Sequence, residues 1–228
     1  MSIIKAINVH KIYDTGKIQV KALKGVNLEV EKGEMIAVMG PSGCGKTTLL
    51  NCLSGLDDLT AGTVLIEGND IHAMKDNPRT EYRAQKMGFI FQSFNLLPVL
   101  TAVENVELPL LVSGTNPKIS REKAEKALNL VGLDEWKNHK PAELSGGQQQ
   151  RVTIARSLVN EPAIVWADEP TGNLDTENSL EIIKLLEKLN KENEQTFVIV
   201  THDPKIGKKC QREIHMQSGV IMKQITNN

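Results

Sequence analysis

A strand, a glycine-rich loop and a helix follow one another without interruption, and this order constrains the fold more than any other feature of the sequence. Residues 35–39 carry no polar side chain, which is typical of a strand buried on both faces. Residues 47–53 favour a helix that ends near Gly55. Between them lies a complete match to the phosphate-loop pattern G-x-x-x-x-G-K-[ST], namely Gly40-Pro41-Ser42-Gly43-Cys44-Gly45-Lys46-Thr47. This order predicts an α/β fold with a loop of functional residues at the carboxyl end of a strand.

The residue types in this loop suit the binding of a nucleoside triphosphate. Glycines let successive backbone N–H groups point inward as an anion nest, and a helix start adds partial positive charge. We expect Lys46 to reach the β- and γ-phosphates and the Thr47 hydroxyl to bind Mg²⁺. Thr48 is expected to donate a hydrogen bond to another phosphate oxygen. A chance turn of the same composition is the alternative, but it gives no reason for the flanking strand and helix.

A second glycine-rich loop lies about a hundred residues later. Ser145-Gly146-Gly147-Gln148 matches the capping-box pattern S-x-x-Q at a helix start. A helix start alone explains the serine and the glutamine, but the glycine pair costs conformational entropy and favours a close approach to the backbone. The first loop already encloses a nucleotide on one side. We infer that the second loop serves a nucleotide bound to another copy of the chain.

Two acidic residues follow the apolar strand predicted at residues 163–167. The carboxylate of Asp168 is a candidate Mg²⁺ ligand that is expected to act through a water molecule, because Mg²⁺ gives up its waters reluctantly. Glu169 is the candidate base that polarises the attacking water. An acidic turn that merely ends a strand is the alternative reading of this pair.

Strand and helix signals predict how the 228 residues are organised. Residues 3–9, 20–23 and 26–30 predict an antiparallel β part, and residues 196–200 another buried strand. We expect one domain: a nucleotide-binding core of residues 1–91 and 161–228, with an inserted helical subdomain at 92–160. Within the helical regions, Ser120 is the expected N-cap and Gly132 the stop of one helix, and a second helix spans residues 176–190. That second helix is expected to bury Leu180, Ile183, Leu186 and Leu189, and a hairpin is expected around Ser218-Gly219.

Composition limits the possible partners and locations. The formal net charge of −1 gives no general attraction to nucleic acid, so no nucleic-acid partner is expected. The chain has no long apolar run that predicts a membrane span or a secretory signal. Its three cysteines are scattered, which favours a reducing cytoplasm. Any role at a membrane therefore requires a partner.

The order of these motifs resembles that of the ATPase subunits of ATP-binding-cassette (ABC) transporters. The resemblance spans nearly the whole chain and includes the phosphate loop, Gln92, residues 144–148, residues 164–169, Asn173-Leu174-Asp175 and His202. Residues 91–98, 104–109 and 167–175 resemble the lipoprotein-release and macrolide-export (LolD/MacB-like) branch. The resemblance implies a P-loop NTPase core with a mostly parallel sheet, an N-terminal antiparallel β part and an inserted helical subdomain.

The resemblance also implies roles for single residues. Tyr13 matches the aromatic residue that stacks on adenine, although an edge-strand tyrosine is an equal alternative from sequence alone. Gln92 matches a glutamine that touches Mg²⁺ and the attacking water, and His202 a histidine that contacts the γ-phosphate. Asp175 matches a residue that crosses to the opposite subunit. Trp166 stands where the family usually has an aliphatic residue, and we expect it to change packing and not chemistry.

The resemblance further implies ATP and Mg²⁺ as cofactors and a head-to-tail dimer of the chain around two ATP molecules. The partner would be a permease at the inner face of the membrane, and the activity ATP hydrolysis that drives export or extraction of a lipoprotein, peptide or drug. An ABC ATPase of an import system shares the same motor and stays open as an alternative. A soluble P-loop kinase has no use for residues 145–148. An ABC ATPase that acts on DNA or ribosomes normally needs coiled coils or a second cassette.

Overall fold

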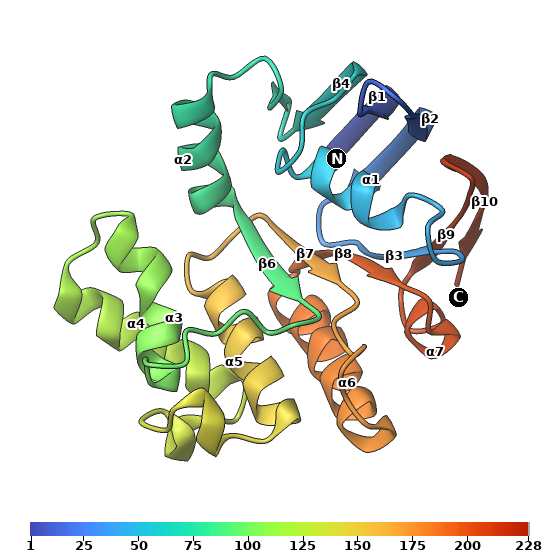
Figure 1. Cartoon of the computed structure of the whole chain (residues 1–228). Coiled ribbons are helices and arrows are strands. Elements are labelled where there is room, and N and C mark those ends of the chain that lie inside the picture. The colour runs from blue at the N-terminus through green and yellow to red at the C-terminus, as the bar shows by residue number, and fades with distance from the viewer. Residues whose placement is uncertain (228) are drawn as a thin grey trace. The chain divides into compact units, whose positions relative to one another are not determined.

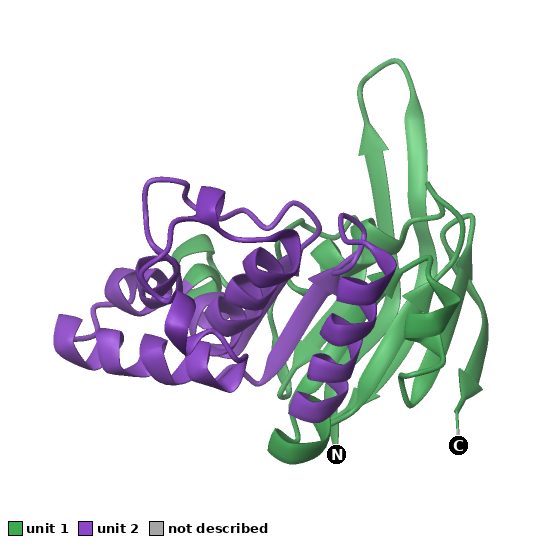
Figure 2. Cartoon of the chain, turned by 90° about the horizontal axis from the view of Figure 1, so that it is seen from below, with its two compact units in different colours: residues 1–80, 190–228 green, residues 81–189 purple. Residues whose placement is uncertain are grey.

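The computed structural model describes residues 1–227, which form two compact units. Unit 1 contains residues 1–80 and the described residues from 190 onward, and unit 2 contains residues 81–189 (Figure 2). Within residues 1–227, every helix is too short or too polar to span a bilayer.

An antiparallel sheet forms the first part of unit 1 (Figure 1). Its strands are β1 (Ser2–Asp14), β2 (Gln19–Glu31), β4 (Ala61–Ile66) and β5 (Asn69–Asp70), in the order β2-β1-β4-β5. The two strands predicted at residues 20–23 and 26–30 are one strand, so that prediction was wrong. Gly25 adopts a left-handed φ of +81°, and register shifts in the β1–β2 ladder absorb the irregularity, so pairing continues through it.

The second group of strands in unit 1 carries the phosphate loop. Here β9 (Arg212–Gln217) and β10 (Val220–Thr226) form the expected hairpin, and β3 (Met35–Met39) runs parallel to both β9 and β8 (Thr196–Thr201). All residues of β3 and β8 are buried, which explains why neither strand alternates between apolar and polar residues. Helix α1 (Lys46–Leu53) follows β3 and packs against β1, β2 and β8, while α7 (Pro204–Gly207) follows β8.

Unit 2 combines two parallel strands with a group of helices (Figure 2). Strand β6 (Met87–Phe91) follows α2 (Asp76–Lys86) and pairs with β7 (Ile164–Asp168). Residues 92–160 hold helices and loops but no strand. Helix α5 packs on β6, α3 and α4. The helical elements of this unit are α3 (Ala102–Val112), α4 (Pro117–Leu130), η1 (Asp134–Trp136), η2 (Pro141–Glu143), α5 (Gly146–Leu158) and α6 (Thr176–Asn193). The division of the chain into core and helical subdomain at residues 92 and 160 stays a prediction.

Two details of the predicted helices were wrong. Helix α4 begins at Pro117, with the Asn116 side chain accepting a hydrogen bond from the Lys118 N–H at 2.9 Å. Ser120 lies inside the helix because Asn-Pro already supplies both a cap and a first helical residue. In α6, Leu180 is 42 % exposed, and Ile182 is buried together with the other expected apolar residues of the helix.

Two polar side chains hold the loop between β6 and α3. The amide of Asn105 is fully buried. Its Oδ1 accepts from the Leu97 N–H at 2.8 Å, and its Nδ2 donates to the carbonyls of residues 97, 100 and 101 at 3.0–3.1 Å. Arg156 donates to the carbonyls of Phe94 and Asn95 at 2.8 and 2.7 Å, and both of these residues have left-handed φ values. Side chains from α3 and α5 therefore both bind the backbone of this loop.

We predict that Asn105→Ala lowers the free energy of unfolding by about 2–3 kcal/mol, because it leaves the Leu97 N–H and several carbonyls without their partner. Urea unfolding followed by circular dichroism measures this change. Asn129→Ala is the matched control, since Asn129 is exposed on α4 and should change stability by less than about 0.5 kcal/mol. Equal stabilities of the two variants would contradict the structural role of Asn105.

Candidate nucleotide-binding site

The phosphate loop follows β3 and contains three glycines with positive φ. Gly40, Gly43 and Gly45 have φ values of +153°, +76° and +105°. A Cβ at Gly40 would collide with the carbonyl oxygen of Met216 in β9. A Cβ at Gly45 would lie 2.7 Å from the carbonyl oxygen of Ala22 in β2. The loop is thus packed against the backbone of two strands, and glycine is required at both places.

Lys46 lies across this loop. Its Nζ donates to the carbonyls of Gly40 at 2.8 Å and Pro41 at 3.1 Å, and the residue is only 8 % exposed. Thr47 and Thr48 follow it in the first turn of α1. The N-cap is Gly45, which has no side chain to cap the helix, and the first turn contains no acidic residue. The amino end of α1 therefore carries the arrangement of charge and N–H groups that binds an anion.

The carboxyl-terminal hairpin supports the phosphate loop from another side. The N–H of Gly219 donates to the carbonyl of Cys44 at 2.9 Å, and the Gly219 carbonyl accepts from the Lys24 N–H at 3.0 Å. Cys44 itself is buried. The sequence indicated a turn at Ser218-Gly219, but no local signal places that turn beside the phosphate loop. Gly219 therefore supports the phosphate loop, a role that sequence reasoning missed.

Strand register brings His202 to the same sheet edge as the phosphate loop. β3 and β8 are parallel, and Met39 is paired with Thr201. Gly40 therefore directly follows the end of β3, and His202 directly follows the end of β8. His202 is exposed.

Tyr13 lies near the end of β1 with a partly exposed ring. Val20 of β2 is its cross-strand partner, so the two side chains share one face of the hairpin. Tyr13 is 40 % and Val20 53 % exposed. Val20 is a further candidate for contact with a nucleotide base, and only its register opposite Tyr13 identifies it.

The other predicted catalytic residues meet in unit 2. Phe91 of β6 pairs with Asp168 of β7, so Gln92 and Glu169 both follow at the same edge of this strand pair. Gln92 Nε2 donates to Asn173 Oδ1 at 3.2 Å, and Asn173 Nδ2 donates to the Gln92 carbonyl at 3.0 Å. Glu169 has a left-handed φ of +47°, a conformation that costs a non-glycine residue about 1–3 kcal/mol.

A buried glutamine supports the turn that contains Glu169. Gln150 of α5 is fully buried, and its Nε2 donates to the carbonyl of Pro170 at 2.5 Å. Its Oε1 accepts from the Thr153 hydroxyl at 2.9 Å. Sequence reasoning missed Gln150, although a glutamine on the buried face of a helix is a recognisable signal. The contact helps to hold the residue next to Glu169 in place.

The second glycine-rich loop begins α5 with the expected capping box. Ser145 Oγ accepts from the Gln148 N–H at 3.3 Å, and Gln148 Oε1 accepts from the Ser145 N–H at 2.8 Å. A Cβ at Gly147 would overlap the side chain of Asn178. Packing within the chain therefore explains Gly147, and the inferred nucleotide contact depends on the exposed Ser145 and the half-buried Gly146.

Asp175 controls the position of Asn178. Its Oδ1 accepts from the Asn178 N–H at 2.8 Å and its Oδ2 from the Asn178 side-chain amide at 2.6 Å. These hydrogen bonds lower the pKa of the exposed Asp175 carboxyl. The contact of Asp175 with an opposite subunit stays a prediction.

The candidate Mg²⁺ ligands are a hydroxyl, an amide and a carboxylate. Thr47 belongs to unit 1, and Gln92 and Asp168 belong to unit 2. Among residues 1–227, no three His, Cys, Asp or Glu side chains form a group that could hold a metal ion. Oxygen donors of these types suit Mg²⁺, which usually binds one or two carboxylates together with substrate phosphates.

Similar proteins identify the family. A family model described as "ABC transporter" matches residues 23–172. The lipoprotein-releasing system ATP-binding protein LolD of Saccharophagus degradans is 47% identical over 222 residues, which cover 97% of this chain and 97% of that protein. The macrolide export ATP-binding/permease protein MacB of Syntrophobacter fumaroxidans is 44% identical over 97% of this chain, which spans 31% of that longer protein.

Solved structures agree with this assignment. The ATP-binding cassette MJ0796 of Methanocaldococcus jannaschii, a dimeric post-hydrolysis state bound to ADP and Pi, has a TM-score of 0.90 and 43% identity. The match covers 99% of each chain. The predicted α/β fold class and family are confirmed. The chain belongs to the ABC transporter family, as one of its ATP-binding subunits.

Proposed function

We propose that two copies of this chain close head-to-tail around two ATP molecules and drive a membrane permease. The observation that carries this proposal is the presence of two anion-binding helix starts in one chain, the Gly45–Lys46 start of α1 and the Ser145–Gly146 start of α5. In each composite site, Lys46 of one copy and Ser145 of the other would face the same ATP. The dimeric cassette with ADP and Pi supports this arrangement.

On the phosphate side, the backbone N–H groups of the loop and the Lys46 ammonium bind the β- and γ-phosphates. Lys46 would exchange its hydrogen bonds to the two loop carbonyls for phosphate oxygens. Thr47, Asp168 and Gln92 would hold Mg²⁺, which neutralises phosphate charge when it is bound. Tyr13 and Val20 would offer their exposed faces to the adenine ring.

Glu169 accepts the proton of the attacking water in this proposal. Its left-handed backbone is held partly through the Gln150–Pro170 contact, so the carboxylate needs little reorganisation when ATP binds. Gln92 and His202 orient the water and the γ-phosphate. Loss of the γ-phosphate removes the group that bridges the two copies, and the dimer reopens.

The permease contact is proposed for the loop between β6 and α3. Leu97 and Val99 are 44 % and 73 % exposed, although Asn105 and Arg156 hold the surrounding backbone in one conformation. An apolar surface on a rigid loop suits contact with a protein partner. The names of the LolD and MacB relatives support lipoprotein release or export as the transport class. In that role the chain would work at the cytoplasmic face of the membrane, bound to its permease.

We predict that Glu169→Gln still binds ATP but hydrolyses it about 10²–10⁴-fold more slowly, because the variant lacks the base. ATP should then hold the variant as a stable dimer. Phosphate release and size-exclusion chromatography with light scattering measure the two effects. Lys46→Ala is the contrasting variant, which should lose ATP binding and stay monomeric. Normal hydrolysis by Glu169→Gln would refute the assignment of the base.

We also predict that Ser145→Arg abolishes ATP-dependent dimerisation and leaves ATP binding by the monomer intact. The substitution removes the capping hydroxyl and places a long side chain where the second nucleotide would approach. Ser113→Arg, at an exposed serine after α3, is the matched control with the same change in size and charge. Dimer formation is measured by light scattering in a Glu169→Gln background. A dimer of normal affinity in Ser145→Arg would contradict the composite site.

A further inference from the structure

The hydroxyl of Tyr13 is hydrogen-bonded to a charged pair, Asp57 and Lys11. Tyr13 Oη donates to Asp57 Oδ2 at 2.7 Å. The other carboxylate oxygen of Asp57 accepts from Lys11 Nζ at 2.6 Å. Lys11 Nζ in turn lies 4.8 Å from the centroid of the Tyr13 ring. Each of the three side chains therefore contacts both of the others.

Burial and charge make these contacts stronger than ordinary surface hydrogen bonds. The side chains of Lys11 and Asp57 are only 12% and 30% exposed. Although burial alone would raise the pKa of Asp57, hydrogen bonds from Lys11 and Tyr13 lower it, so its carboxyl is ionised. Burial, and then the bond to Asp57, raises the pKa of Tyr13, so the phenol keeps the proton that it donates. The result is a charge-assisted hydrogen bond.

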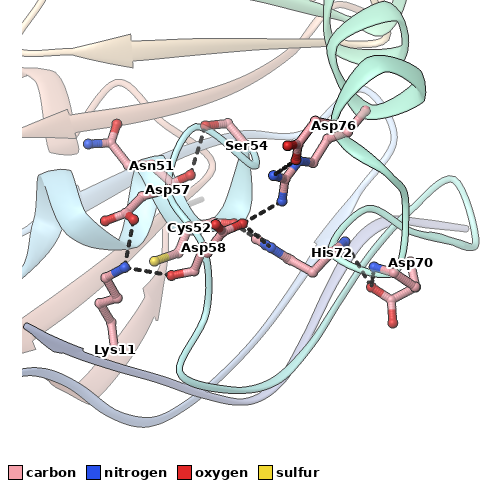
Figure 3. Close-up of polar contacts among 11 residues, drawn as sticks. Lys11, Asn51, Cys52, Ser54, Asp57, Asp58, Asp70, His72 and Asp76 are labelled. Atoms are coloured by element: carbon pink, nitrogen blue, oxygen red, sulfur yellow. Dashed lines mark hydrogen bonds and ion pairs between the residues drawn. The ribbon is translucent and has the colours of Figure 1, made fainter.

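The loop that carries Asp57 is itself attached on both sides. The N–H groups of Leu56 and Asp57 donate to the Asn51 carbonyl in α1 at 2.9 and 3.1 Å. On the other side, Asp58 pairs with Arg79 at 2.5 Å. Figure 3 shows Lys11 between Asp57 and Asp58, where it also donates to the Asp58 carbonyl at 2.7 Å. If the loop that carries Asp57 moved together with the tyrosine, these hydrogen bonds and the ion pair would break.

Helix α1 lies in sequence between the phosphate loop and the loop that carries Asp57. α1 begins with Lys46 and is eight residues long, and Asp57 lies just beyond its end. The Tyr13 hydroxyl is tethered while 40 % of the residue remains exposed. Lys11 lies over one face of the ring, so a base would stack on the opposite face, and a ring held at its hydroxyl has little rotamer freedom left to lose when a base binds.

We propose that Asp57 and Lys11 are positioning residues that hold Tyr13 by its hydroxyl and so form the adenine-binding surface in advance. This inference rests on the proposed adenine contact of Tyr13. Its consequence is specific to the base: the affinity for ATP depends on the tether, whereas the affinity for a base-free polyphosphate does not.

The test measures the binding of ATP and of inorganic tripolyphosphate to Tyr13→Phe, Asp57→Ala and the double variant by isothermal titration calorimetry. Each single variant should bind ATP about 3–10-fold more weakly, from the freedom that the ring regains, and should bind tripolyphosphate as the wild type does. The double variant should be no weaker than the singles, because both remove the same hydrogen bond. Asp134→Ala is the matched control: it makes the same substitution at an exposed carboxylate of η1 that takes no part in the tether, and it should bind ATP normally.

Tyr13→Ala separates the two proposals. If this variant binds ATP like the wild type, the adenine contact itself is wrong. If it weakens ATP binding while Tyr13→Phe and Asp57→Ala do not, the adenine contact stands and the tether is overturned. Equal weakening of ATP and tripolyphosphate by Asp57→Ala would also overturn the tether, since it would indicate damage to the phosphate loop. Thermal unfolding checks that each variant is folded.

Discussion

The close approach of the phosphate loop to two neighbouring backbones is the constraint on which the nucleotide site depends. Gly40 lies against the carbonyl of Met216 and Gly45 against that of Ala22, at distances that no side chain would allow. The turn at Gly219 adds a hydrogen bond to the Cys44 carbonyl. Because these partners come from distant parts of the sequence, the curl of the loop is set by tertiary packing before any phosphate binds.

Preorganisation recurs in the other parts of the machinery. Glu169 has a left-handed backbone beside a carbonyl that Gln150 binds. Asp175 fixes Asn178, which fills the space that glycine leaves at position 147. In each case a polar side chain bonds to the backbone or amide next to a candidate site residue. Such contacts reduce the reorganisation that binding and catalysis require, which is the main source of electrostatic rate enhancement.

Local rules predicted those parts of the structure whose causes lie within a few residues. The capping box at Ser145 belongs to this class, since its hydrogen bonds join residues three positions apart. Predictions of element boundaries and burial were wrong where a stronger local signal or a distant partner determined the structure. Asn116 capped α4 ahead of Ser120, and pairing with β1 carried β2 through Gly25 as one strand. Leu180 is exposed because burial depends on the neighbours of α6 and not on spacing alone.

The sequence by itself determined the fold class, the family and the chemical identity of the candidate site residues. Each of these follows from residue types in a fixed order, which can be read from the sequence without a structure. Only the tertiary structure decided that Gly219 supports the phosphate loop, that Val20 faces the same side as Tyr13, and that Asp57 binds the Tyr13 hydroxyl. These contacts join residues far apart in the chain, and strand register and packing, which local sequence does not encode, bring them together.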